Sequence, residues 1–77
     1  MSIFHYEDPQ YVQLFLDNLE PMQTFKVIFV TQKEEQRAYV GTLDPDKPST
    51  RNNSVAILTD DGWKRFSLDR VLWVGIV

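Results

Sequence analysis

The stretch that decides the fold expected for this chain is WKRFSLDRVLWVGIV, residues 63–77. Residues 63–67 alternate in character and predict a strand, and residues 67–70 have the composition of a short helical turn. Residues 71–77 contain no polar side chain and predict a final strand. Such an ending is typical of small antiparallel barrels. The side chains expected to hold the barrel shut are Phe66, Leu68, Val71, Leu72 and Val74.

Three further strands are expected upstream, separated by polar segments. They cover residues 25–31 (FKVIFVT), 37–43 (RAYVGTL) and 54–59 (SVAILT). In the first strand, Phe25, Val27 and Phe29 share one face, because side chains alternate along a strand. Gly41 in the second strand favours a bulge or a bend, of the kind that a small barrel needs to close.

The segments between these strands predict loops. Residues 32–36 (QKEEQ) are polar and predict a hairpin loop, although they include no glycine. Residues 44–53 (DPDKPSTRNN) combine two prolines with small polar side chains and predict a solvent-exposed loop. Residues 60–62 (DDG) predict a tight turn in which Gly62 supplies a positive φ, so a second hairpin is expected here.

An amphipathic helix is expected before the first strand. Asp8 is suited to cap the helix, and Pro9 would occupy the first helical position, where its missing N–H costs nothing. Pro21 is expected to end the helix. The helix would present one broad apolar stripe, formed by Tyr11, Val12, Phe15, Leu16 and Leu19.

Together these elements predict an α+β protein that is mainly β. We expect a small five-stranded antiparallel SH3-like barrel over residues 25–77, preceded by a tail and one amphipathic N-terminal helix over residues 1–24. A chain of 77 residues has room for a single domain, residues 1–77. Because the chain has no cysteine, packing alone has to stabilise that domain.

Charge is distributed unevenly along the chain, whose net charge is -3. Residues 1–24 carry Glu7, Asp8, Asp17 and Glu20 but no lysine or arginine, whereas the remainder is slightly basic. Overall acidity argues against sequence-independent binding of nucleic acid, which depends on neutralising phosphates. The chain shows no targeting signal and no apolar run long enough to cross a membrane, so we expect a cytoplasmic protein without membrane contacts.

No residue pattern predicts catalysis, a metal site or a cofactor. His5 is the single histidine, and there is no cysteine with which it could form a metal site. Asp60 and Asp61 are explained by the turn that they form with Gly62. The sequence shows no general base beside a serine or threonine that could activate its hydroxyl. The glycines are isolated, so no Gly-rich phosphate-binding loop is expected. We therefore expect the protein not to be an enzyme and to need no cofactor.

Cationic and aromatic side chains on the expected strands are candidates for a binding surface. They are Arg37, Tyr39, Trp63, Lys64, Arg65, Arg70 and Trp73. Stacking and charge presented together are typical of surfaces that bind bases or proteins. The alternative, which we favour, is that the aromatic residues belong to the core and the cations are solvated. A partner-facing side of the helix is the second candidate, formed by Gln10, Gln13, Asp17 and Glu20.

Two segments, FVTQKEEQRAYVGTL at residues 29–43 and GWKRFSLDRV at residues 62–71, resemble a phage-borne family called WYL-like, or WYL_2. The family tends to show a Phe, a Lys-rich turn, an Arg and a Thr-Leu in the first segment, and Gly-Trp-Arg-Ser-Phe-Arg before a valine in the second. This chain departs from the pattern at Glu35, where a glycine is usual, and at Lys64-Arg65. It also contains no consecutive Trp-Tyr-Leu. The resemblance implies an SH3-like or Sm-like barrel and a phage setting, and hence the cytoplasm of a host cell.

These observations favour a small non-enzymatic, phage-type accessory protein that binds and modulates a host protein, with inhibition as the expected effect. The alternative is a module of WYL or Sm-like type that binds single-stranded nucleic acid or a nucleotide. A third hypothesis is a homo-oligomer that forms through an uncapped sheet edge.

Overall fold

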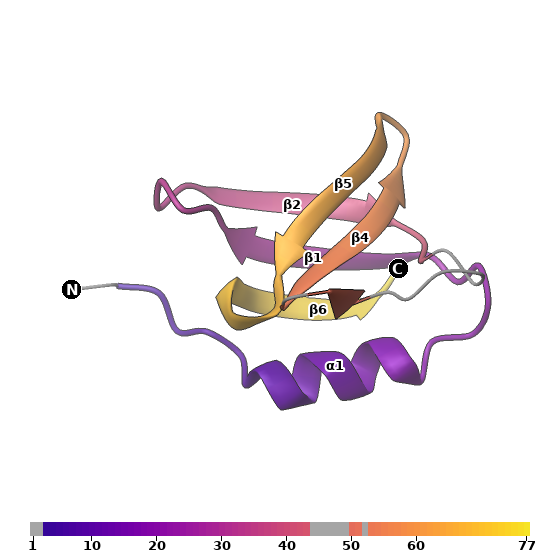
Figure 1. The fold of residues 1–77 in the computed structure, drawn as a ribbon, viewed down its shortest axis with the longest axis horizontal. Coiled ribbons are helices and arrows are strands. Elements are labelled where there is room, and N and C mark those ends of the chain that lie inside the picture. Colours follow the sequence, from indigo (N-terminus) through magenta and orange to yellow (C-terminus); the bar gives the residue numbers. More distant parts are fainter. Residues whose placement is uncertain (1–2, 44–49, 52) are drawn as a thin grey trace.

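The computed structural model of this chain describes residues 3–43, 50–51 and 53–77 (Figure 1). In these residues one helix precedes five strands of six residues each, and a two-residue strand and a short 3₁₀ helix lie among the strands. In chain order the elements are α1 (Pro9–Asp17), β1 (Phe25–Val30), β2 (Gln36–Gly41), β3 (Thr50–Arg51), β4 (Ser54–Thr59), β5 (Gly62–Ser67), the 3₁₀ helix η1 (Leu68–Arg70) and β6 (Val71–Ile76). The strand, helical turn and last strand expected over residues 63–77 are confirmed.

The described strands form two antiparallel sheets of three strands each. β1 lies between β2 and β6 in one sheet, and β4 lies between β3 and β5 in the other. Figure 1 shows the β4–β5 hairpin rising from the body of the molecule and α1 running below β6. The mainly-β architecture with an N-terminal helix is thus confirmed. β3 departs from the prediction, because it falls within the loop expected at residues 44–53; residues 44–49 and 52 of that loop lie outside the described residues.

One corner joins the two sheets through a pair of backbone hydrogen bonds. The Thr42 N–H donates to the Leu58 carbonyl at 3.1 Å, and the Leu58 N–H donates to the Thr42 carbonyl at 2.8 Å. Among the described strands this bridge is the one ladder connection between the sheets, so the barrel is open rather than closed. A Cβ atom at Gly41 would run into the backbone of Leu58. A glycine at this position therefore lets the two sheets meet.

The bulge expected at Gly41 is not found there. β1 and β2 stay in register along their whole length. The irregularity lies instead in the pairing of β1 with β6, between Ile28 and Phe29. A bulge bends a strand and increases its twist. This irregularity therefore bends the sheet where β1 pairs with β6, and not where β1 pairs with β2. Gly41 acts through close approach of the backbones rather than through an extra residue.

The core lies between the two sheets and is completed by α1. Its buried side chains are Val12, Leu16, Phe25, Val27, Phe29, Val55, Ile57, Phe66, Leu68, Val71 and Val74. Phe25, Val27 and Phe29, expected to share one face of β1, are all buried. Four of the five side chains expected to hold the barrel shut are also buried, although the barrel is open. The fifth, Leu72, is half-buried. Burial of these apolar surfaces supplies the main driving force for folding in a chain without disulfides.

Helix α1 begins as predicted. The Asp8 carboxylate accepts a hydrogen bond from the Gln10 N–H at 2.8 Å, and Pro9 occupies the first turn. Val12 and Leu16 are the buried residues of the helix. They lie one turn apart on the same face and fasten α1 to the core. The N-cap and the apolar spacing therefore determined where this helix forms and which way it faces.

The end of α1 differs from the prediction. The helix ends at Asp17, before the stop expected at Pro21. The Asn18 side chain donates to the Leu14 carbonyl at 2.8 Å, which satisfies one of the orphan carbonyls at the helix end. Tyr11, expected in the buried stripe, is 50% exposed, so the stripe that packs on the core is narrower than predicted.

Candidate protein-binding surfaces

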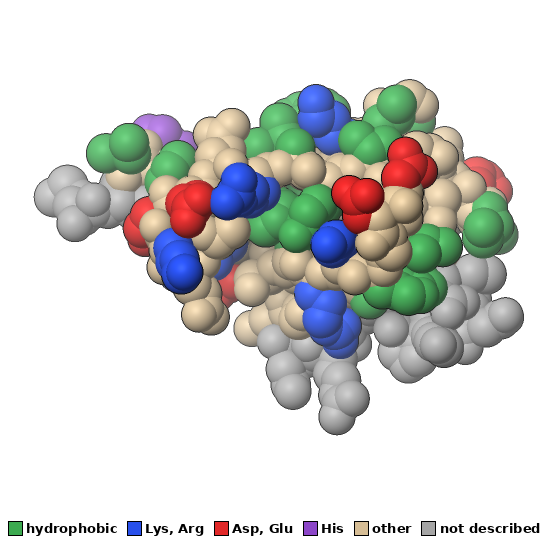
Figure 2. Space-filling view, turned by 90° about the horizontal axis from the view of Figure 1, so that it is seen from above, with side chains coloured by type: hydrophobic (Ala, Val, Ile, Leu, Met, Phe, Trp, Pro, Cys, Tyr) green, Lys and Arg blue, Asp and Glu red, His purple; other side chains and the backbone are tan. Residues whose placement is uncertain are grey.

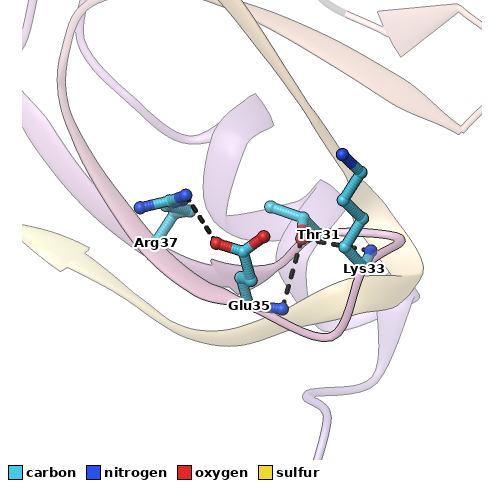
Figure 3. Close-up of polar contacts among 4 residues, drawn as sticks. All are labelled: Thr31, Lys33, Glu35 and Arg37. Carbon is cyan, nitrogen blue, oxygen red and sulfur yellow. Dashed lines mark hydrogen bonds and ion pairs between the residues drawn. The ribbon is translucent and has the colours of Figure 1, made fainter.

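Arg37 forms an ion pair with a residue of the turn between β1 and β2 (Figure 3). Its guanidinium forms an ion pair with the Glu35 carboxylate at 2.7 Å. The Thr31 hydroxyl orders the turn by accepting hydrogen bonds from the N–H groups of Lys33 and Glu35, each at 3.2 Å. Glu34 adopts a φ of 63° and so takes the conformation that glycine usually supplies in such a loop. The hairpin loop is confirmed, and the charge of Arg37 has a partner within it.

Arg70 and Tyr39 both contribute to the fold. Arg70 Nη1 donates to the Thr31 carbonyl at 3.0 Å and so ties η1 to the end of β1. Tyr39 is half-buried and packs on the core, with its ring centroid 4.8 Å from that of Phe29. The core interpretation is therefore confirmed for Tyr39. The hydrogen bond to Thr31 gives Arg70 a structural role that requires no binding partner.

The two tryptophans lie on the surface, so the expectation that they belong to the core is wrong. Trp63 is 49% exposed and Trp73 is 45% exposed. In β5 the buried position is taken by Phe66, which faces Val55, and this register turns Trp63 outward. Trp73 is on β6, and its indole lies across Gly75, where a Cβ atom would come within 2.5 Å of the ring. The tryptophans thus sit on different sheets.

Lys64 and Arg65 occupy opposite faces of β5. Arg65 shares the outer face with Trp63, whereas Lys64 shares the core side with Phe66 and is half-buried. Neither cation has an ion pair with a described residue. Of the seven predicted binding residues, the structure therefore brings Trp63 and Arg65 together on one exposed face of β5. Arg37 and Tyr39 share a face of β2, and Trp73 lies on a different sheet from Trp63.

The cations do not merge into one basic patch on the face of the molecule shown in Figure 2. There, Lys and Arg side chains are interspersed with Asp, Glu and hydrophobic side chains. A track of phosphates needs several cations in a continuous groove.

A groove between α1 and β6 is the site that the sequence did not predict. It is a shallow hollow of about 270 Å³. Its lining residues are Tyr11, Leu14, Phe15, Asn18, Leu19 and Ile76. Leu14 is 61% exposed and Ile76 is 53% exposed, which is unusual for large aliphatic side chains that lie together. The available signal was Leu14, which lies three residues after Tyr11 and so extends the apolar surface of the helix beyond the stripe predicted from Tyr11, Phe15 and Leu19.

The polar residues predicted on the helix flank this groove. Asp17 lies one turn after Leu14 and is exposed, and its carboxylate accepts a hydrogen bond from Gln13 Nε2 at 2.8 Å. Gln10 and Glu20 are also exposed. The groove therefore has a mainly apolar lining, with the carboxylate of Asp17 beside it one turn from Leu14, and residues 1–24 carry no lysine or arginine.

Neither a metal site nor a membrane span is found in the part of the chain that the structure describes. No three His, Cys, Asp or Glu side chains there come close enough to share an ion. No helix among the described residues has the length and apolar character needed to cross a bilayer.

Comparisons with protein-family models, with curated proteins and with solved structures found no match to this chain. The resemblance of residues 29–43 and 62–71 to the WYL-like family stays a prediction.

Proposed function

We propose that this chain is a small non-enzymatic accessory protein that binds a partner protein through the groove between α1 and β6. The observation that carries the proposal is the exposure of Leu14, Tyr11 and Ile76 around one hollow. Val12 and Leu16 already hold helix α1 on the core, whereas Tyr11 and Leu14 remain exposed. Exposed apolar side chains gathered in a hollow, with an aromatic among them, are typical of the centre of a protein interface.

The occupant that fits this groove is an amphipathic helix with basic residues along its polar side. Tyr11 and Leu14, at positions i and i+3 of α1, have the spacing by which one helix packs against another. Asp17 and Glu20 would lie beside the polar side of the bound helix, where lysine or arginine would complement them. An acidic helix would meet like charge at the same edge and bind more weakly.

The setting proposed for this interaction is a phage protein that modulates, and by expectation inhibits, a host protein. The support is the resemblance to the phage-borne WYL-like family. A further support is the order in which β5 leads through η1 into β6, which agrees with the strand, turn and strand expected of the barrel that the resemblance implies. Binding of a regulatory helix in the groove would block whatever that helix normally contacts. This would give inhibition without any catalytic group.

Co-purification from host cells, followed by mass spectrometry, tests the proposal with a matched pair of variants. Leu14→Gln removes the apolar centre of the groove. Ile3→Gln makes the same change at a site that is 84% exposed and belongs to the tail. A groove partner should be captured by the wild type and by Ile3→Gln, whereas Leu14→Gln should weaken its binding by about tenfold or more. Equal capture by all three proteins would exclude the groove.

The charge of the occupant is tested by calorimetry with the segment of the captured protein that binds. Asp17→Lys reverses the charge at the groove edge, and Glu34→Lys makes the same change in the β1–β2 turn. A basic helix should lose affinity for Asp17→Lys and keep it for Glu34→Lys. An occupant that binds Asp17→Lys as tightly as the wild type would contradict the basic helix.

The nucleic-acid alternative has weaker support. Arg37 is paired with Glu35, Arg70 donates to a backbone carbonyl, and Trp73 is on a different sheet from Trp63. Binding of single-stranded DNA or RNA that weakens steeply as salt is raised would nevertheless favour that alternative. No binding at low salt would dispose of it.

A further inference from the structure

We infer that the free edge of β5 is a second docking site, which takes an extended segment of a partner protein carrying an acidic side chain two residues from an apolar one. This site is separate from the α1–β6 groove and does not depend on it. Three features of β5 support the inference: its place at the edge of a sheet, its exposed side chains, and its unpaired positive charge.

β5 is an edge strand. Among the described strands it pairs with β4 alone, from Ser54 opposite Ser67 to Thr59 opposite Gly62. The β4–β5 hairpin rises from the rest of the molecule in Figure 1. An edge strand presents unpaired N–H and C=O groups along one side, and an extended segment can satisfy them by adding a strand. The backbone supplies affinity in this mode, and the side chains supply selectivity.

Two side chains on the outer face of β5 set that selectivity. Trp63 is 49% exposed, and Arg65 lies two residues further along the same face. Their partners on β4 are Leu58 and Ala56, which carry no charge. A strand added at the free edge would place its own side chains beside Trp63 and Arg65. An apolar residue suits the indole, and a carboxylate suits the guanidinium.

A second copy of the chain fits this edge poorly. Lys64 and Arg65 are neighbours, and β5 carries no acidic residue. Antiparallel pairing of two β5 strands centred on these residues would bring Lys64 opposite Lys64, Lys64 opposite Arg65, or Arg65 opposite Arg65. Like charges directly opposite destabilise a pair of strands. The same two cations that disfavour self-pairing favour an acidic strand, so the occupant is a partner protein rather than another copy.

Nuclear magnetic resonance titration with two short synthetic peptides tests the inference. Both have alternating β-branched residues, and one carries Glu two positions from Phe, whereas the other carries Lys in place of Glu. The acidic peptide should shift the backbone amides of β5 and β4 and should bind about fivefold more tightly than the basic one. Shifts centred on α1, equal affinity for the two peptides, or no shift with either would overturn the inference.

Two charge reversals make the result specific. Arg65→Glu should abolish or reverse the preference for the acidic peptide. Lys33→Glu makes the same change in an exposed turn and should leave the preference intact. Both side chains are exposed, so both variants should keep the wild-type amide spectrum outside the substituted region. A preference that survives Arg65→Glu would also overturn the inference. Leu14→Gln should have no effect, which separates this edge from the groove.

Discussion

Replacing Gly41 by alanine should break the corner that joins the two sheets. The added Cβ would lie 2.8 Å from the Leu58 carbonyl carbon and 3.2 Å from Ile57 Cγ1, and the nearer neighbour is backbone, which cannot rotate away. The strands would have to separate, at the expense of both hydrogen bonds between Thr42 and Leu58. Each lost hydrogen bond costs about 1 kcal/mol, and the crowding at Ile57 adds some strain. The free energy of unfolding should therefore fall by about 2–3 kcal/mol. A domain of this size has roughly 4–12 kcal/mol in total.

Urea denaturation monitored by circular dichroism measures this loss, and amide hydrogen exchange locates it. In thermal unfolding, the melting temperature of the Gly41→Ala protein should be roughly 10–20 °C below that of the wild type. The amides of Thr42 and Leu58 should lose protection before those at the centre of β1. Gly62→Ala is the control: its φ of 102° strains any side chain, but no atom lies within 4 Å of the added Cβ. It should cost about 1–2 kcal/mol and leave the corner amides protected.

Two results would refute this reasoning about the corner. One is a free energy of unfolding for Gly41→Ala within about 0.5 kcal/mol of the wild-type value, which is the range of neutral surface substitutions. The other is normal protection of the Thr42 and Leu58 amides in a destabilised Gly41→Ala protein. In that case the loss would arise elsewhere in β2.

Three further substitutions test other contacts. Asp8→Ala removes the cap on the Gln10 N–H and should cost about 1 kcal/mol in urea denaturation, with faster amide exchange in the first turn of α1; an unchanged midpoint would show that the cap is not needed. Arg70→Met keeps the aliphatic stem but removes the hydrogen bond to Thr31, and should cost about 1–2 kcal/mol, whereas a stabilised protein would contradict a structural role for the guanidinium. Trp63→Ala should cost no more than about 2 kcal/mol by thermal unfolding, because half of the side chain is already in water; a loss above about 3 kcal/mol would indicate a core tryptophan.

Local signals in the sequence were enough to place most elements of the fold. Asp8 and Pro9 marked the start of α1, and the β-branched and aromatic residues of FKVIFVT marked the strand β1. Gly62 marked the turn between β4 and β5, and it does have a positive φ. Each of these signals depends on a few neighbouring residues, which is why the sequence alone could reveal it.

Features that depend on distant residues escaped prediction. The orientation of Trp63 follows from the register of β5 against β4, and a shift of one residue would exchange its place with that of its neighbours. Pairing of Thr50 and Arg51 with β4 likewise cannot be recognised in two polar residues. The groove was missed because five of its six lining residues fall between Tyr11 and Leu19, whereas the sixth, Ile76, is 62 residues beyond Leu14 (76 minus 14). Its apolar spacing was visible, but only the fold shows that nothing among the described residues covers it.

The pairing of β1 with β6 has a consequence for how the chain folds as it is made. Phe25 lies opposite Ile76, so these paired residues are 51 positions apart (76 minus 25) in a chain of 77. The β4–β5 hairpin, by contrast, involves neighbours and can form as soon as its residues have left the ribosome. β1 has to wait with one side unpaired until β6 has been synthesised. During that interval the segment FKVIFV is an open apolar edge, and the growing chain is most exposed to aggregation or to capture by a chaperone.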